Sequence, residues 1–218
     1  REDLPPPGWE GGFVNSLGLT LIRDSSGNTC FTDTAGWEKR INKDSPCHPV
    51  RGGRQSITVE RVDPALGSDY ELTRYAFSWA EYRGFNDGKE VVAAHAQYEI
   101  NDGKDIPFGE LAWLGCSKTL RGYYLGRWRD NDSLFFNFEW RIRNPMILPE
   151  RIQSIISDTY TVLFYDVGRV FQDYKKLTFE PSEFHSATGI GLRIIIQPQI
   201  VVQADLGFSR EQTAFFLD

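Results

Sequence analysis

Two short groups of residues carry side chains that could do covalent or metal chemistry. His185 and Ser186 are adjacent and combine a base with a hydroxyl, and His48 stands beside Cys47. Successive side chains of a strand point to opposite faces of a sheet, so His185 and Ser186 cannot form a nucleophile–base pair. His48 and Cys47 supply two ligands where a structural zinc site uses four, so we expect no metal and no cofactor.

Glu139 and Asp166 are a third candidate, because two carboxylates can share general acid–base work. No other residue pattern in the sequence supports that use, and no phosphate-binding glycine loop or zinc signature is present. We therefore expect a protein that is not an enzyme. The position of these two acids depends on the elements that carry them.

Nine segments alternate apolar and polar residues with the period of two that is typical of β-strands. They are residues 13–24, 55–62, 70–85, 90–100, 133–143, 160–171, 186–197, 199–207 and 213–218. Segment 70–85 exceeds the usual globular strand of about 5–6 residues and suits a tilted membrane strand, which needs roughly 9–11. In segment 133–143 one face is wholly apolar, and the other carries Asn137, Glu139 and Arg141. That pattern fits lipid on one side and a polar lumen on the other.

The segments follow one another as hairpins, and Asn86-Asp87-Gly88-Lys89 is a tight-turn signal between two of them. A meander of this kind closes into a barrel or leaves its edges exposed. The sequence therefore predicts an all-β fold, a transmembrane antiparallel up-and-down β-barrel of about nine strands. We expect an irregular lead-in at residues 1–12 and the barrel domain at residues 13–218.

Residues 25–53 interrupt the strand pattern and form a polar insertion that contains Cys30 and Cys47. In an oxidising compartment a Cys30–Cys47 disulfide would close this insertion, and unrelated free thiols are the alternative. The net charge of -6 and the pI of about 5.2 argue against nucleic acid as a partner.

Two short motifs, about forty residues apart, frame the strand that carries Glu139. The first motif is Leu120, Arg121, Gly122 and Tyr123, and the second comprises Phe164, Asp166 and Gly168 in the order Phe-x-Asp-x-Gly. With these motifs and the closing glycine-rich segments 189–193 and 205–209, the chain resembles the C-terminal barrel half of the BamA–TamA superfamily, the bacterial surface-antigen type of outer-membrane assembly barrel.

The resemblance implies that residues 120–123 lie at the tip of an extracellular loop that folds back into the lumen. There Arg121 would pair with Asp166 and Glu139. The physical chemistry agrees, because a guanidinium keeps its charge and needs a planar acceptor, and both acids lie on faces that point inward. We expect these three residues to hold the loop in place.

The resemblance also implies a role at the bacterial, or organelle, outer membrane in folding, insertion or translocation of other proteins. The partners would be outer-membrane lipid, unfolded or secreted protein substrates and other envelope chains. A substrate strand would pair at a weak seam that involves residues 213–218. A membrane anchor or passive pore is the alternative, and a soluble all-β binding module is a third.

Three departures from the family stand out. Cys116 replaces an expected second glycine, residues 25–53 lengthen a turn that is usually short, and the terminal aromatic is missing at Asp218. Family barrels have about sixteen strands behind periplasmic repeat domains, within the range that such barrels span. We therefore expect either part of a larger barrel or a free-standing barrel of eight strands.

Overall fold

The computed structural model describes residues 7–26, 49–145, 149, 156–177, 179–196 and 200–218. The main sheet has nine strands, as predicted, and their order in the sheet is their order in the chain. These strands are β1 (Ser16–Asp24), β2 (Arg51–Val62), β3 (Leu72–Phe85), β4 (Glu90–Gly103), β7 (Asp132–Arg143), β8 (Ile156–Phe171), β9 (His185–Ile196), β10 (Ile200–Ser209) and β11 (Thr213–Leu217).

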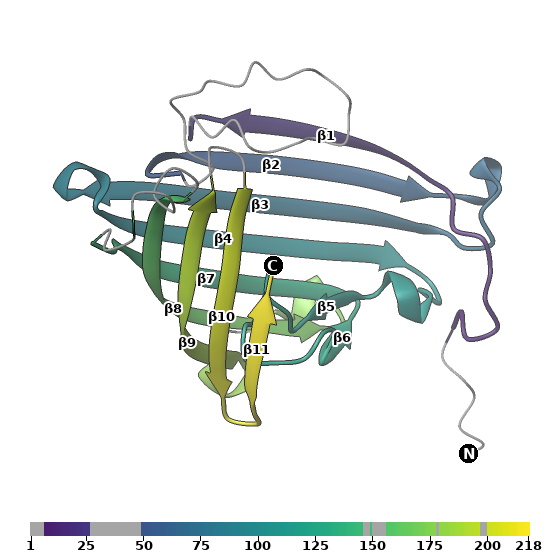
Figure 1. The fold of residues 1–218 in the computed structure, drawn as a ribbon. Helices are drawn as coiled ribbons and strands as arrows, with labels where there is room; N and C mark the ends of the chain where they lie inside the picture. Colours follow the sequence, from purple (N-terminus) through teal and green to yellow (C-terminus); the bar gives the residue numbers. More distant parts are fainter. Residues whose placement is uncertain (1–6, 27–48, 146–148, 150–155, 178, 197–199) are drawn as a thin grey trace.

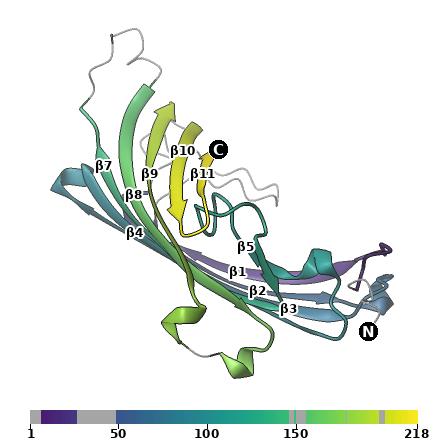
Figure 2. The same ribbon diagram turned by 90° about the horizontal axis from the view of Figure 1, so that it is seen from below.

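Each strand of the main sheet pairs antiparallel with the next, from β1–β2 to β10–β11. Figures 1 and 2 show that the sheet is strongly curved, with β1 at one edge and β11 at the other. The all-β antiparallel meander is therefore confirmed. Over the residues that the structure describes, the sheet is an open, curved wall and does not close on itself.

The two faces of the wall differ as the alternation predicted. The convex face carries exposed apolar side chains, among them Leu19, Phe77, Phe138, Ile190 and Phe215. Residues that pair directly across antiparallel strands share a face, so the register brings these side chains into one continuous apolar surface. The concave face, which we call the lumen face, carries polar, charged and small residues over β2, β3 and β4, and it carries Phe135 and Phe164 where the segment between β4 and β7 packs on it. This division matches a membrane barrel wall with lipid outside.

Small elements that the alternation did not reveal lie between the strands. Strands β5 (Ala112–Leu114) and β6 (Trp128–Asp130) form a separate two-stranded sheet. Short 3-10 turns are η1 (Pro64–Leu66), η2 (Asn86–Gly88), η3 (Phe108–Glu110), η4 (Tyr174–Lys176) and η5 (Pro181–Glu183). The predicted tight turn between β3 and β4 is present, with Asn86 and Asp87 at positive φ. No helix in the described ranges is long and apolar enough to cross a membrane.

The main apolar cluster lies between the lumen face and the β5–β6 segment. Its buried members are Leu114, Leu120, Tyr123, Phe135 and Ala187. They come from the segment between β4 and β7 and from strands β7 and β9. This segment is therefore packed against the wall, although it lacks the regular pairing of the main sheet.

Candidate functional site

The loop between β4 and β7 folds back over the lumen face and carries the first motif at its tip (Figure 2). Its two arms pair as β5 and β6, and the Gly126 N–H donates to the Gly115 carbonyl (3.0 Å). Beyond this neck the chain turns toward the sheet, where Leu120, Arg121 and Tyr123 are buried. The loop therefore buries the guanidinium of Arg121 against the sheet, where acidic side chains must neutralise its charge.

Arg121 meets Asp166 of β8 in a forked contact. Its Nε donates to Asp166 Oδ2 (2.8 Å), and its Nη2 donates to Asp166 Oδ1 (2.7 Å). The Arg121 backbone N–H also donates to Asp166 Oδ2 (3.0 Å). A bidentate pair with an added backbone hydrogen bond fixes both the direction and the height of the loop tip over the sheet.

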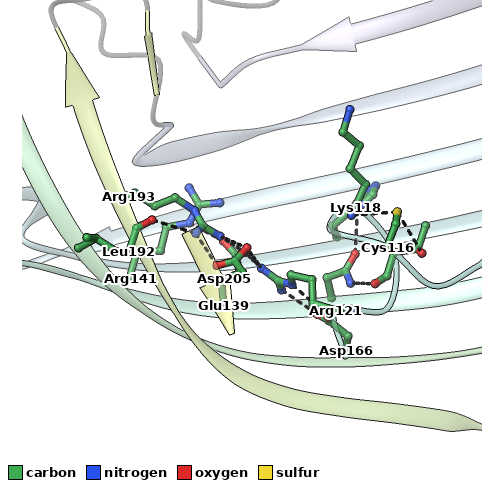
Figure 3. A network of polar contacts seen from close by, with 12 residues as sticks. Cys116, Lys118, Arg121, Glu139, Arg141, Asp166, Leu192, Arg193 and Asp205 are labelled. Atoms are coloured by element: carbon green, nitrogen blue, oxygen red, sulfur yellow. Dashed lines mark hydrogen bonds and ion pairs between the residues drawn. The ribbon is translucent and has the colours of Figure 1, made fainter. Parts of the chain in front are cut away.

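Glu139 of β7 supplies the second carboxylate to Arg121. Its Oε1 accepts a hydrogen bond from Arg121 Nη1, and its Oε2 accepts one from Arg141 Nε (2.7 Å). The structure thus brings together the three residues that the sequence singled out, which we call the latch: Arg121, Glu139 and Asp166 (Figure 3). Because both carboxylates are engaged by arginines, the arrangement suits charge neutralisation.

The other residues of the second motif make room for the loop and stack against it. The guanidinium of Arg121 lies over the Phe164 ring, 3.8 Å from its centroid. A Cβ on Gly168 would lie 2.7 Å from Phe135 Cβ and 3.1 Å from Leu114 Cδ1, so only a glycine leaves this space for the loop. In the Phe-x-Asp-x-Gly order, the three spaced positions point to one face and all meet the loop.

Gly122 and Tyr123 place the tip against β9. The Tyr123 hydroxyl donates to the Ser186 carbonyl (3.2 Å), and its ring packs in the apolar cluster. Gly122 has a φ of 140°, and a Cβ there would lie 2.8 Å from the Ala187 Cβ. The Thr119 carbonyl, just before the motif, accepts from Asn137 Nδ2 (2.5 Å). The tip is therefore held by hydrogen bonds and close packing on both sides of the latch.

Arg193 and Asp205 lie within the closing glycine-rich segments 189–193 and 205–209, and the sequence alone assigned them no role. Arg193 of β9 donates to both carboxylate oxygens of Asp205 in β10, at 2.5 and 3.0 Å. Arg193 Nη2 also lies 3.4 Å from Glu139 Oε1, and Arg121 Nη1 lies 3.6 Å from Asp205 Oδ2. With these two residues the latch extends across four strands.

The remaining candidates lie apart from the latch. His185 stacks on Trp128, with ring centroids 3.6 Å apart, and Ser186 uses its carbonyl toward Tyr123. In the part of the chain that the structure describes, no three His, Cys, Asp or Glu side chains are grouped to hold a metal. Cys30, Cys47 and His48 lie outside the described residues, so their disulfide and ligand roles stay predictions.

A hollow of about 620 Å³ lies on the lumen face beside the loop. Polar, charged and small side chains from β2, β3, β4 and β7 line it, together with the loop itself. Representative lining residues are Arg54, Ser78, His95, Lys118 and Arg141. Arg121 and Glu139 of the latch also line this hollow.

Two comparisons with known proteins bear on this arrangement. A family model described as the Omp85 superfamily domain matches residues 32–213. Among solved structures, BamA from Haemophilus ducreyi, in a form lacking POTRA domains 1–3, is similar with a TM-score of 0.61 and 19% sequence identity. The match covers 80% of this chain and 40% of that one, so this chain spans less than half of the BamA chain. At this identity the structural likeness concerns the fold.

Proposed function

The chain belongs to the Omp85 superfamily and is an outer-membrane protein, and from this we propose that it forms part of a barrel wall that inserts or translocates other proteins. The single observation that carries the proposal is the lumen loop that Arg121 latches to the curved sheet, next to the strands that lead to β11. The role is a mechanical one, in which strands are paired and released. It requires no bond-making chemistry.

Strand β11 offers the pairing surface in this proposal. It has five residues and pairs with β10 from Phe208–Thr213 to Ala204–Leu217. Its other edge carries no strand in the described residues, so its N–H and C=O groups on that side can pair with an incoming strand. Unfolded or secreted proteins with strands to donate are the partners that this edge suits.

The latch has the complementary role of keeping the wall in shape while strands pair at the edge. A buried arginine held by two carboxylates resists displacement, because moving Arg121 out of the site would leave buried carboxylates without their ion-pair partner. The exposed apolar side chains of the convex face contact outer-membrane lipid, and the polar lumen face stays wet. Other envelope chains are further partners.

The test is an insertion assay with the full-length protein. The purified protein is reconstituted into lipid vesicles, an unfolded outer-membrane barrel is added, and the protease-protected, heat-modifiable client is measured. We expect faster client insertion than in empty vesicles, and a loss of that gain in Asp166→Asn. Asp158→Asn, at an ion pair with Arg143 near the opposite end of β8, is the matched control.

The anchor or pore alternative gives a different result in the same vesicles. The protein would fold and become heat-modifiable, yet client insertion would match that in empty vesicles. Permeation of small solutes through such vesicles would then distinguish a passive pore from an anchor.

A further inference from the structure

We infer that Arg193 and Asp205 are positioning residues that couple the lumen loop to the strands carrying the terminal edge, so that the latch also sets where β11 lies. This inference rests on the proposed function, in which β11 is the strand that pairs with clients.

The Arg193–Asp205 pair is built into the lumen face. Both side chains are about 3% exposed, and the fork of Arg193 meets both oxygens of Asp205. Gly191 of β9 lies directly opposite Asp205 and two residues before Arg193 on the same face. A Cβ there would lie 2.0 Å from Asp205 Oδ1 and 2.8 Å from Arg193 Nη1. Any larger residue at this position would occupy the space that the ion pair needs.

The pair is linked to the latch at both ends. Glu139 Oε1 is shared between Arg121 and Arg193, while Asp205 approaches both Arg193 and Arg121 (Figure 3). Positive and negative groups therefore alternate around a ring of four side chains. In such a ring each charge is stabilised by two neighbours, so the pair and the latch hold their positions together.

The ring reaches the edge of the sheet through β10. Asp205 is the register partner of Phe216 in β11, and Gly207 is the partner of Ala214. A Cβ on Gly207 would lie 2.2 Å from the Arg121 carbonyl oxygen, so the loop tip rests directly on the β10 backbone. The loop is thus fixed to β10, the strand that pairs with β11, by the Arg121–Asp205 ion pair and by its contact with the backbone at Gly207.

A second contact supports this link at the end of the hairpin. Arg127, on the loop side of β6, donates to Glu211 in the turn between β10 and β11 (2.8 Å). This pair is about 40% exposed, with 45% for Arg127 and 36% for Glu211, so it adds little on its own. The buried pair is the stronger tie and is the one to test.

The experiment is hydrogen exchange by mass spectrometry on the full-length protein in detergent micelles. In Asp205→Asn we expect amides of residues 213–218 to exchange about tenfold faster, which corresponds to a loss of about 1.4 kcal/mol of local protection. Amides of β2 and β3 should keep their wild-type rates. The matched control Asp158→Asn, at an exposed ion pair with Arg143, should leave residues 213–218 unchanged.

A charge swap distinguishes the ring from an ordinary cross-strand pair. In Arg193→Asp with Asp205→Arg, an isolated pair would re-form, but in the ring the new aspartate faces Glu139 and the new arginine faces Arg121. We therefore expect no recovery of protection in the double variant. Recovery, or unchanged exchange in Asp205→Asn, would overturn the inference.

One further variant keeps the test decisive. If Asp205→Asn gives no heat-modifiable barrel, Arg193→Lys retains the charge but loses the fork, and the same increase in exchange is expected. The exchange result does not depend on client insertion. A wild-type protein that inserts no client would therefore refute the proposed function and leave the coupling between loop and edge strand standing.

Discussion

Asp166 binds both the side chain and the backbone of Arg121, with three hydrogen bonds between 2.7 and 3.0 Å. The side-chain fork sets the orientation of the guanidinium, and the backbone N–H sets the height of the chain above the strand. A lysine at this position would keep the backbone hydrogen bond but could not form the side-chain fork. Asp166 therefore positions the loop tip as well as neutralising it.

Loss of the Asp166 charge should release the loop. In Asp166→Asn the buried Arg121 loses its forked partner, and we expect the free energy of unfolding to fall by about 3–5 kcal/mol. The measurement is unfolding in detergent combined with trypsin digestion, with new cleavage after Lys118 and Arg121. Asp158→Asn, at an exposed ion pair, should change both readouts little.

The aromatic contact beneath Arg121 should be worth less than the ion pair. Phe164→Leu removes a ring that lies 3.8 Å from the guanidinium in a site shielded from solvent. We expect a loss of about 2 kcal/mol in the free energy of unfolding. Phe135→Leu removes an equally buried ring from the apolar cluster and should cost less, and equal losses in the two variants would contradict a role for the cation–π contact.

Close packing of the loop on β10 can be tested with a single methyl group. Gly207→Ala places a Cβ 2.2 Å from the Arg121 carbonyl oxygen, and we expect a destabilisation of about 1–3 kcal/mol with the loop displaced. Gly109→Ala is the matched control, because its added Cβ meets nothing within 4 Å. Trypsin accessibility of the loop should rise in the first variant alone.

The assignment of faces can be tested with one charge on each side of the wall. Phe138 points outward and is 47% exposed, whereas Gln97 lines the lumen hollow. In lipid vesicles Phe138→Arg should lower the free energy of unfolding by about 2–4 kcal/mol, and Gln97→Arg should cost much less. Equal costs would mean that the convex face does not contact lipid.

Much of the fold followed from periodicity, because each strand has one wet and one apolar face. Phe138 and Asn137 lie on opposite faces, as their alternation predicted. The three latch residues were selected because their motifs resemble those of a known family, and the alternation placed Glu139 and Asp166 on the inward faces of their strands. Strands β5 and β6 were missed, since three-residue strands hardly show a period.

Arg193 and Asp205 illustrate what the sequence could not supply. Their contact depends on the β9–β10 register, in which Arg193 pairs with Gln203 and meets Asp205 diagonally. A shift of one residue would turn one side chain to the lipid face. Glycine at position 191 was the available signal, because it leaves room for a charged pair, but its meaning appears only once the neighbours are known.

Gly189, Gly191 and Gly207 leave gaps in the side-chain layer on the inner surface of β9 and β10, beside Arg193 and Asp205. The Phe164 ring and the loop tip fill that volume, since Cβ atoms at positions 189 and 207 would clash with them. The loop tip is thus part of the interior packing of these strands. Under the proposed function, withdrawal of the loop would leave a glycine-rich stretch next to β11 that could bend as a client strand pairs there.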